Sequence, residues 1–290
     1  MSHYSGHKFN LDTDNDSWSH LYQLIDPHTR LLDVGCANGN FGAALKETKS
    51  CEVIGIDIDK DDLAIAKKQL DAAFLVDITK DEISHLGKFD YILFADVIEH
   101  LVDPRSVLQR MKPLLKKNGK ILFSIPNMAH VSVRIDLLEG KFPYRDRGLL
   151  DKTHLHFYDS NEVDSVFEDS GYAIVHMHPT VVMQTLKTIK LRLEESGLKA
   201  LPKFHDTLLK TKGDIFQFVG YAEPLPKYVT SVKKREYIMP HDELRQRIDD
   251  LEHENERLAE ENNRIKQHAN TVTKKVLIKK LIDKNLKIIE

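Results

Sequence analysis

The sequence predicts an α/β protein built on a doubly wound, largely parallel sheet. Short apolar strands alternate with amphipathic segments of helical length from residue 31 to about residue 126, which is the pattern of βαβ units. A glycine-rich loop follows the first strand, and the acids at 57, 77 and 96 close later strands. Because right-handed crossovers bring the carboxyl ends of parallel strands to one edge, these features are expected to meet there.

The individual elements follow from hydrophobic periodicity and from the breakers between apolar runs. Strands are expected over residues 31–34, 52–56, 73–76, 89–95, 119–125, 172–177 and 216–222. Helices are expected over residues 16–25, 41–49, 60–70, 104–115 and 160–170, the last with Gly171 as its C-cap. The last strand is expected to pair antiparallel with the one before it, and the polar segment 184–210 between them to be a helical insertion.

Changes in composition divide the chain into five parts. These are an N-terminal segment 1–28, a main domain 29–226, a linker 227–240, a coiled coil 241–273 and a basic tail 274–290. In the first part, the helix at 16–25 is expected to pack on the sheet. The alternative is a lid over a ligand, with contributions from Tyr4 and Trp18.

Overall composition narrows the classes of function. The net charge is −3, and no basic stripe marks the main domain, so we expect no nucleic-acid partner. The two cysteines, Cys36 and Cys51, make neither a metal cluster nor a disulfide framework. There is no signal-peptide core and no run of about 20 apolar residues. A cytoplasmic protein is therefore expected.

The coiled coil is predicted from a heptad repeat with two seams. One seam is Leu244, Leu251, Leu258 and Ile265, and the other is Ile248, Asn255, Asn262 and Ala269. Leu at d with polar or branched residues at a favours a parallel two-stranded coil, and Asn at a specifies the partner number. We therefore expect a homodimer, the alternative being a single solvated helix.

The basic tail has an apolar face and a local charge of +4, from six Lys against Asp283 and Glu290. A basic amphipathic helix can lie on an anionic membrane surface or dock on a partner protein. The third alternative is a plain extension of the coil. The periodicity does not choose among the three, so attachment at the periphery of a membrane stays open.

The glycine-rich loop gives the first indication of a ligand. Its glycines are Gly35, Gly39 and Gly42, and Asp33 lies two residues before the first. This G-x-x-x-G-x-x-G spacing differs from the G-x-G-x-x-G of dinucleotide sites. An acid at the mouth of the loop suits a cationic ligand without phosphate. The spacing therefore counts against a nicotinamide-dependent oxidoreductase.

Four motifs in order resemble those of the class I S-adenosylmethionine-dependent methyltransferases, over about residues 28–224. They are Leu32–Gly39, Ile54–Asp57, Val76–Asp77 and Phe89–Leu101. The resemblance implies a Rossmann-like seven-stranded sheet with helices on both faces, and S-adenosyl-L-methionine as the cofactor. The family pattern implies cofactor contacts at Asp33, Gly35, Cys36, Gly39, Asp57, Ile58, Asp77, Ile78, Ala95 and Asp96.

The segment Gly148–Tyr158 further resembles a subgroup associated with O-methylation of glycans and other small molecules. This resemblance implies an acceptor that is a sugar, a glycan end or a similar hydroxylated molecule. A hydroxyl acceptor benefits from a general base. The candidate bases are His154, His156 and His100, with Asp151 to orient one of them. If residues 154–156 are extended, His154 and His156 share one face.

Two further motifs bear on alternatives. Asp96-x-x-Glu99-His100 is similar to an acid-x-x-Glu-His cluster that binds a divalent ion in some quinone-biosynthesis O-methyltransferases. We expect no metal here, because relatives without metal share the Glu-His pair. Ser124–Asn127 does not match the strand-end motif of enzymes that methylate amino groups of nucleic acids. The competing function is a methyltransferase-like scaffold that acts through its coil and tail.

Overall fold

The computed structural model describes residues 15–182 and 184–225, with 236–237, 257, 261 and 264. Residues 1–239 and residues 240–290 are two separate compact units. Tyr4, the predicted coiled coil and the basic tail lie outside the described residues, except for three helical, exposed positions, Arg257, Glu261 and Arg264. Exposure at these three positions fits a coil and a single helix equally, so the dimer stays a prediction.

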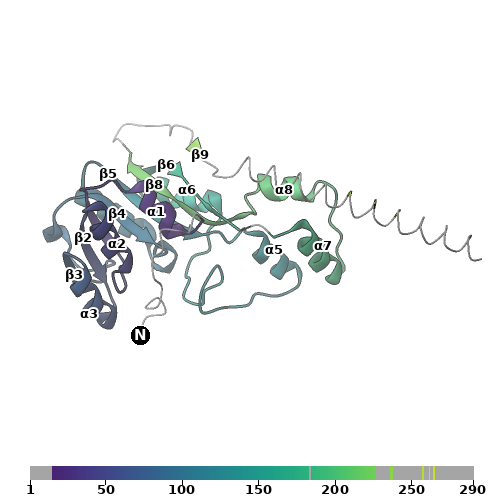
Figure 1. Cartoon of the computed structure of the whole chain (residues 1–290), viewed down its shortest axis with the longest axis horizontal. Helices are drawn as coiled ribbons and strands as arrows, with labels where there is room; N and C mark the ends of the chain where they lie inside the picture. Colours follow the sequence, from purple (N-terminus) through teal and green to yellow (C-terminus); the bar gives the residue numbers. More distant parts are fainter. Residues whose placement is uncertain are drawn as a thin grey trace, which may run out of the picture. The chain divides into compact units, whose positions relative to one another are not determined.

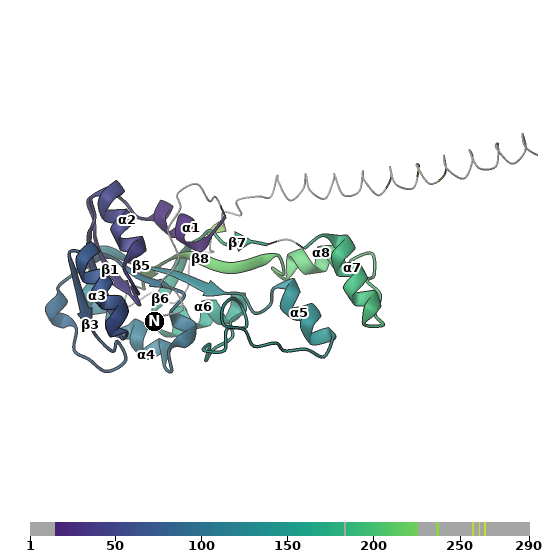
Figure 2. The same cartoon turned by 60° about the horizontal axis from the view of Figure 1, so that its bottom comes forward.

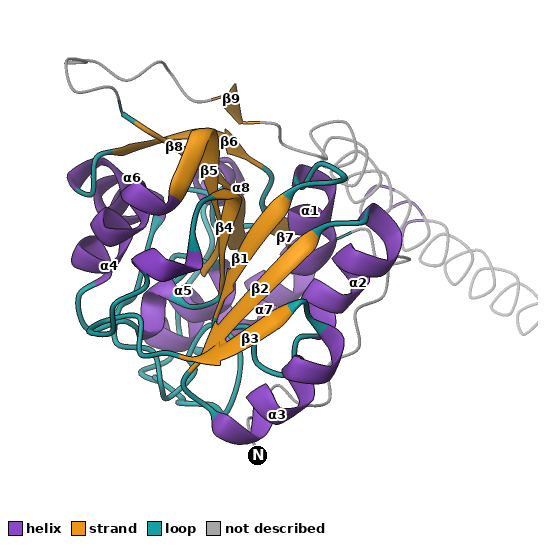
Figure 3. Ribbon diagram, turned by 90° about the vertical axis from the view of Figure 1, so that its left-hand side faces the viewer, coloured by secondary structure: helices purple, strands orange, loops and turns teal. Residues whose placement is uncertain are grey.

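One mixed sheet forms the centre of the first unit, in the order β3-β2-β1-β4-β5-β8-β6-β9, with β7 paired to β8 (Figure 3). The strands are β1 Arg30–Val34, β2 Glu52–Asp57, β3 Ala72–Leu75, β4 Phe89–Ala95, β5 Leu115–Pro126, β6 Tyr172–Met177, β7 Thr180–Val181, β8 Ile215–Pro224 and β9 Glu236–Tyr237. Strands β1 to β5 are parallel, and β8 runs antiparallel to β5 and β6. The expected antiparallel pair is confirmed. The short strands β7 and β9 exceed the seven predicted, and β9 falls inside the predicted linker.

Helices cover both faces of the sheet. They are α1 Ser17–Leu24, α2 Asn40–Lys49, α3 Lys60–Gln69, α4 Pro104–Met111, α5 Val131–Leu138, α6 Ser160–Asp169, α7 Leu186–Glu195 and α8 Phe204–Lys210. Buried residues of α1, α2 and α3 share one core cluster, whereas those of α4 and α6 share the other. Successive strand residues alternate between the clusters: Leu31 belongs to the first and Leu32 to the second. The predicted two-faced α/β sheet is confirmed.

The first helix packs as expected for a covering element. Asp16 caps α1 by accepting from the backbone N–H groups of Trp18 and Ser19. The Trp18 ring lies 5.7 Å from that of Phe41, at the start of α2. Leu21, which is fully buried, enters the same core. This helix therefore contributes to the core beside the first crossover.

The expected insertion forms the helices α7 and α8, which pack together with α5. Helices α5, α7 and α8 share a core that includes Val131, Ile189 and Leu208, and they lie together away from β1 to β3 (Figures 1 and 2). Arg192 on α7 binds Asp136 at 2.6 Å and Glu139 at 2.8 Å, next to the end of α5. Among the described residues, no helix is both long enough and apolar enough to cross a bilayer.

One predicted helix is shorter than expected. The helix expected over 104–115 ends at Met111, residues Lys112–Leu114 form a 3-10 turn, and β5 begins at Leu115. Pro113 explains the change, because it has no N–H for an α-helical hydrogen bond and its ring crowds the preceding turn. Strand β5 consequently starts before the predicted residue 119.

Candidate active site

The site is built where the carboxyl ends of β1, β2, β4 and β5 meet. Strand β1 pairs with β2 on one side and with β4 on the other, so the chain changes direction across the sheet at β1. Ligands of open α/β sheets bind at such a switch point, outside the carboxyl ends of the strands. The predicted cofactor residues of the first, second and fourth strands are thereby brought to one edge.

The glycine loop after β1 is held against β2. The backbone N–H groups of Gly35 and Cys36 both donate to the carbonyl of Ile56, at 2.8 and 3.1 Å. Gly35 has φ +72° and Gly39 has φ +80°, in the left-handed region that favours glycine. At Gly35 a Cβ would also lie only 2.8 Å from Val97 Cγ2. The loop thus needs glycine for its conformation and for its close approach to the turn after β4.

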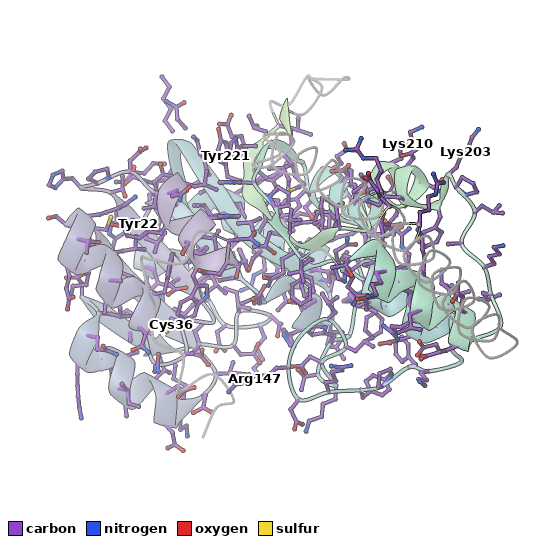
Figure 4. All side chains as sticks on the ribbon, turned by 45° about the vertical axis from the view of Figure 1, so that its right-hand side comes forward. Tyr22, Cys36, Arg147, Lys203, Lys210 and Tyr221 are labelled. Carbon is purple, nitrogen blue, oxygen red and sulfur yellow. The ribbon has the colours of Figure 1, made fainter. Side chains whose placement is uncertain are left out.

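Cys36 stabilises the glycine loop through its backbone hydrogen bond and through the packing of its side chain. The thiol is buried, and burial, with the nearby Asp33 carboxyl, raises its pKa. Its sulfur fills the space beside Gly55, where a Cβ would come within 2.6 Å of it. A neutral, enclosed thiol of this kind is not a nucleophile. Figure 4 labels Cys36 on the left of the view, on the opposite side from Lys203 and Lys210.

The two acids that flank the glycine loop differ in their burial and in their hydrogen bonds. Asp33 is 4% exposed, and burial, with a smaller contribution from Asp57, raises its pKa to about 7. No described residue donates a hydrogen bond to the Asp33 carboxyl. The Asp57 carboxylate accepts from the backbone N–H of Ala37 and of Asp59, both at 2.8 Å. Each Asp57 oxygen has a second lone pair, so the carboxylate retains capacity for ribose hydroxyls.

The third acid is engaged locally. The Asp77 carboxylate accepts from Thr79 and pairs with Lys80 at 2.8 Å, which lowers the pKa of Asp77 to about 2. Ile78 is buried, and its carbonyl accepts from Arg110 at 2.6 Å.

Ile58, after β2, is 73% exposed. An apolar side chain left in water at this edge suits contact with an adenine ring.

These residues fit S-adenosylmethionine. The fit rests first on Asp33, because a buried carboxyl without a donor calls for a cationic partner. The ammonium group of the cofactor's methionine portion meets that need. Asp57 would hold the ribose, Ile58 would face the adenine, and the Gly35 and Gly39 backbone would allow close approach. Asp77 would accept from the adenine only through lone pairs that Thr79 and Lys80 leave over.

On the far side of the site, Asp96 is fixed by two residues that the sequence did not indicate. Asp96 follows Ala95 at the end of β4 and has φ +54°. Its carboxylate accepts from the Ser124 hydroxyl at 2.7 Å and from the Gln217 amide at 2.9 and 3.1 Å. Gln217 lies 121 residues away on β8, and no local motif marks it. Burial raises the pKa of Asp96, and the Ser124 bond opposes that shift.

A cavity of about 150 Å³ lies next to Asp96. Its lining residues are Asp96, Glu99, Pro126, Arg147, Gly148, Leu149, His154, Phe216 and Gln217. Glu99 is 1% exposed, and neither of its carboxyl oxygens has a hydrogen-bond partner among the residues that the structure describes. Burial, followed by the charge of Asp96, raises the pKa of Glu99 well above its usual value. A buried, unpartnered carboxyl on a cavity wall points to a polar ligand.

His154 stands beside Glu99 with a defined tautomer. Its Nδ1 lies 3.2 Å from the Leu149 carbonyl, which can only accept, so we assign the proton to Nδ1 and the lone pair to Nε2. Nε2 lies 4.0 Å from a Glu99 oxygen. Burial, followed by the charge of His100, lowers the pKa of His154. A neutral imidazole with a bare Nε2 in a cavity can accept a proton.

The other two predicted histidines differ in position. The His100 ring packs edge-on against that of His154, with centroids 4.8 Å apart, and its Nδ1 lies 3.2 Å from the Thr153 carbonyl. His156 does not line the cavity, and its Nε2 lies 3.4 Å from the Val102 carbonyl.

Residues 154–156 are not a strand, so the condition under which His154 and His156 would share one face is not met. The Asp151 carboxylate accepts from the backbone N–H and the hydroxyl of Thr153, at 2.8 and 2.6 Å, and turns the chain. The N–H groups of Leu155 and His156 then both donate to the Glu99 carbonyl, at 2.9 and 3.1 Å. This turn, rather than a strand, sets His154 against Glu99 and directs His156 elsewhere.

The same corner could hold a metal ion. One ligand atom from each of Glu99, His100 and His154 lies within 4.8 Å of the others. Two imidazoles with one carboxylate suit Zn²⁺ or Fe²⁺ better than Mg²⁺, which prefers oxygen ligands. The set differs from the sequence motif, because the Asp96 oxygens are bonded to Ser124 and Gln217 and His154 takes their place.

Known proteins resemble parts of this chain. Two ubiquinone biosynthesis O-methyltransferases are 32% identical to it, one from Actinobacillus pleuropneumoniae over 108 residues and one from Azotobacter vinelandii over 114 residues. These matches cover 34% and 36% of this chain, and 46% and 49% of the relatives. The chain thus spans about half the length of these relatives.

Solved structures of methyltransferases are also similar. A SAM-dependent methyltransferase from Archaeoglobus fulgidus gives a TM-score of 0.48 at 18% identity, covering 71% of this chain and 91% of that one. A TehB-like SAM-dependent methyltransferase from Corynebacterium glutamicum gives 0.45 at 17% identity, covering 73% and 90%.

A family model described as "Methyltransferase domain" matches residues 14–177. The match includes the glycine loop, the acids at 33, 57, 77 and 96, and the cavity residues Glu99 and His154. It covers more than half of the 290 residues. The chain belongs to this methyltransferase family, for which S-adenosylmethionine is the cofactor.

Proposed function

We propose that the chain transfers a methyl group from S-adenosylmethionine to a hydroxyl group of a small ring-shaped acceptor, such as a sugar, a glycan end or a similar molecule. The observation that carries this proposal is the cavity beside Asp96, where buried Glu99 has no hydrogen-bond partner in the described part of the chain and His154 presents a bare Nε2. An engineered cavity of about 150 Å³ binds benzene, so this one has room for about one ring. Both relatives carry the name O-methyltransferase, which supports oxygen as the acceptor atom.

In this proposal His154 takes the acceptor proton. Bound S-adenosylmethionine would supply the methyl group from a sulfonium, and such an in-line displacement depends mostly on closeness and alignment. The acceptor hydroxyl would donate to Nε2 of His154 and accept from the protonated Glu99 carboxyl. The carbonyl of Leu149 holds the ring orientation through Nδ1, and nearby Asp151 stabilises the imidazolium that forms. Phe216 adds an apolar wall to the cavity.

The test compares His154→Gln with the matched variant His156→Gln. We expect His154→Gln to lower the rate of label transfer from methyl-labelled S-adenosylmethionine into fractionated cell extract by about 10²- to 10⁴-fold. We expect His156→Gln to stay within about twofold, because its ring faces the Val102 carbonyl outside the cavity. S-adenosylhomocysteine binding, measured in parallel, shows whether each variant is folded.

Equal losses in the two variants, or full activity in His154→Gln, would contradict His154 as the base. Chelation separates the metal alternative. A base mechanism predicts no loss of rate in EDTA. A loss that Zn²⁺ or Mn²⁺ restores would instead assign Glu99, His100 and His154 as metal ligands.

A further inference from the structure

One wall of the cavity is a polar side chain whose orientation is fixed. Gln217 on β8 lies opposite Pro126 on β5, the strand beside it, and both residues line the cavity (Figure 3). The backbone N–H of Gln217 donates to the Thr180 hydroxyl at 3.1 Å. Its side-chain Nε2 donates to both carboxylate oxygens of Asp96, at 2.9 and 3.1 Å. The backbone and the amide group of Gln217 are therefore both held in place.

These bonds leave the carbonyl end of the Gln217 amide available. The Asp96 carboxylate accepts its hydrogen bonds, so the group that faces it is the NH₂, and Oε1 lies at the other end of the amide. Among the residues that the structure describes, none donates a hydrogen bond to Oε1. An amide oxygen can only accept. Gln217 therefore presents a fixed hydrogen-bond acceptor to a ligand in the cavity.

The hydroxyl that is methylated cannot serve this acceptor. In the proposed function that hydroxyl donates its single proton to Nε2 of His154 and accepts from Glu99. A hydrogen bond to Oε1 of Gln217 consequently needs a second donor. The cavity of about 150 Å³ has room for about one ring, so the second donor belongs to the same ring as the first.

Resting on the proposed function, we infer that the acceptor ring bears a second hydroxyl or an amino group, which donates to Oε1 of Gln217. Gln217 is thus a specificity-determining residue. A ring with a single hydroxyl leaves Oε1 without a donor and binds less tightly.

The same contact disfavours a second transfer to a ring that has two hydroxyls. Once one hydroxyl is methylated, only the other can face His154, and the ether oxygen then faces Oε1 of Gln217. Two hydrogen-bond acceptors cannot bond to each other. The contact therefore favours a product with one methyl group.

The first test compares small rings in binding to the full chain saturated with S-adenosylhomocysteine. The probes are 1,2-, 1,3- and 1,4-dihydroxybenzene against phenol, and the corresponding cyclohexanediols against cyclohexanol. Calorimetry is expected to show at least one diol binding about three- to tenfold more tightly than the ring with one hydroxyl. The smaller ring cannot be rejected for its size. The inference is overturned if no diol is preferred in either series.

Two variants separate direct contact from an effect through Asp96. Gln217→Met keeps the size of the side chain and removes Oε1, whereas Ser124→Ala removes another bond to Asp96, of 2.7 Å, at a residue that does not line the cavity. The preference for the diol should disappear in Gln217→Met and persist in Ser124→Ala. A preference that survives Gln217→Met, or that both variants lose equally, overturns the inference. Thermal unfolding shows whether each variant is folded, and the wild-type comparison decides alone if Gln217→Met is not.

The second test uses the natural acceptor without identifying it. The product labelled from methyl-labelled S-adenosylmethionine in cell extract is purified and acetylated, and mass spectrometry counts the acetyl groups added. The inference expects at least one, on the donor that faces Gln217. A labelled product that takes up no acetyl group overturns the inference while leaving the proposed function intact. Absence of any labelled product counts against the proposed function, and the probe series then decides the inference.

Discussion

At the scale of single residues, the ionisation of Asp33 couples cofactor binding to pH. Burial raises the pKa of Asp33 to about 7, against about 3.9 in an unfolded chain. Between these values the folded free protein holds a proton that the unfolded chain has lost, so this residue makes stability fall as pH rises through that window. A ligand that places a cation beside Asp33 favours the ionised form and expels the proton.

We therefore predict that the affinity for S-adenosylhomocysteine rises about tenfold between about pH 6 and pH 8, with proton release on binding below about pH 7. Titration calorimetry in two buffers of different ionisation enthalpy measures both. In Asp33→Asn the affinity should be weaker and no longer depend on pH in this range. A wild-type affinity that is flat with pH would show that Asp33 does not face the cofactor's cation.

Some residues of the site could be predicted from the sequence and others could not. Asp33, Asp57 and Asp96 could be predicted because each closes a strand, and strand ends share an edge. Gln217 could not, since its bond to Asp96 spans 121 residues and depends on the register of β8 against β5. His154 was preferred to His156 without a feature of the sequence that separates them, and the hydrogen bonds of the Asp151 turn place the two side chains differently.

At the scale of elements, the glycine loop depends on its contact with the turn after β4. Gly35 and Gly140 both have φ +72°, but a Cβ at Gly35 would lie 2.8 Å from Val97, whereas at Gly140 it would meet nothing within 4 Å. Gly35→Ala and Gly140→Ala therefore share the left-handed penalty of about 1–2 kcal/mol. Only Gly35→Ala adds a steric cost, of about 1–3 kcal/mol.

Urea unfolding should show the larger loss of stability in Gly35→Ala, and calorimetry should show weaker S-adenosylhomocysteine binding in that variant alone. Equal losses in the two variants would mean that the loop can shift away from Val97 without consequence. Comparing two glycines of equal φ separates the cost of the backbone conformation from the cost of the contact.

Elements with strong periodicity were predicted well. Strand β6 falls on its predicted residues, and α6 ends one residue before its predicted end. Errors arose where a local feature outweighed the pattern. Pro113 turned the end of a helix into a 3-10 turn, and the side chain of Asp151 forms a turn in a segment whose conformation the sequence left open. The two-residue strands β7 and β9 are too short to leave a periodic signal.

At the scale of the whole molecule, the function of the main domain and the dimerisation predicted from the C-terminal heptads can be tested separately. The heptad pattern predicts that the full chain is a dimer and that a chain ending at Pro240 is a monomer. Light scattering at matched concentrations distinguishes these states. A truncated chain that remains dimeric would show that the dimer interface lies in the main domain. The seam that contains the Asn residues would then not determine the number of chains.

We assign S-adenosylmethionine to a site at the edge formed by β1, β2 and β4. Titration calorimetry of the full chain with S-adenosylhomocysteine, and separately with NADH, tests this assignment. We expect saturable binding of S-adenosylhomocysteine, weakened by Asp57→Ala, and no binding of NADH. Binding of NADH without S-adenosylhomocysteine would contradict the assignment in favour of an oxidoreductase, and binding of neither would contradict it in favour of a scaffold.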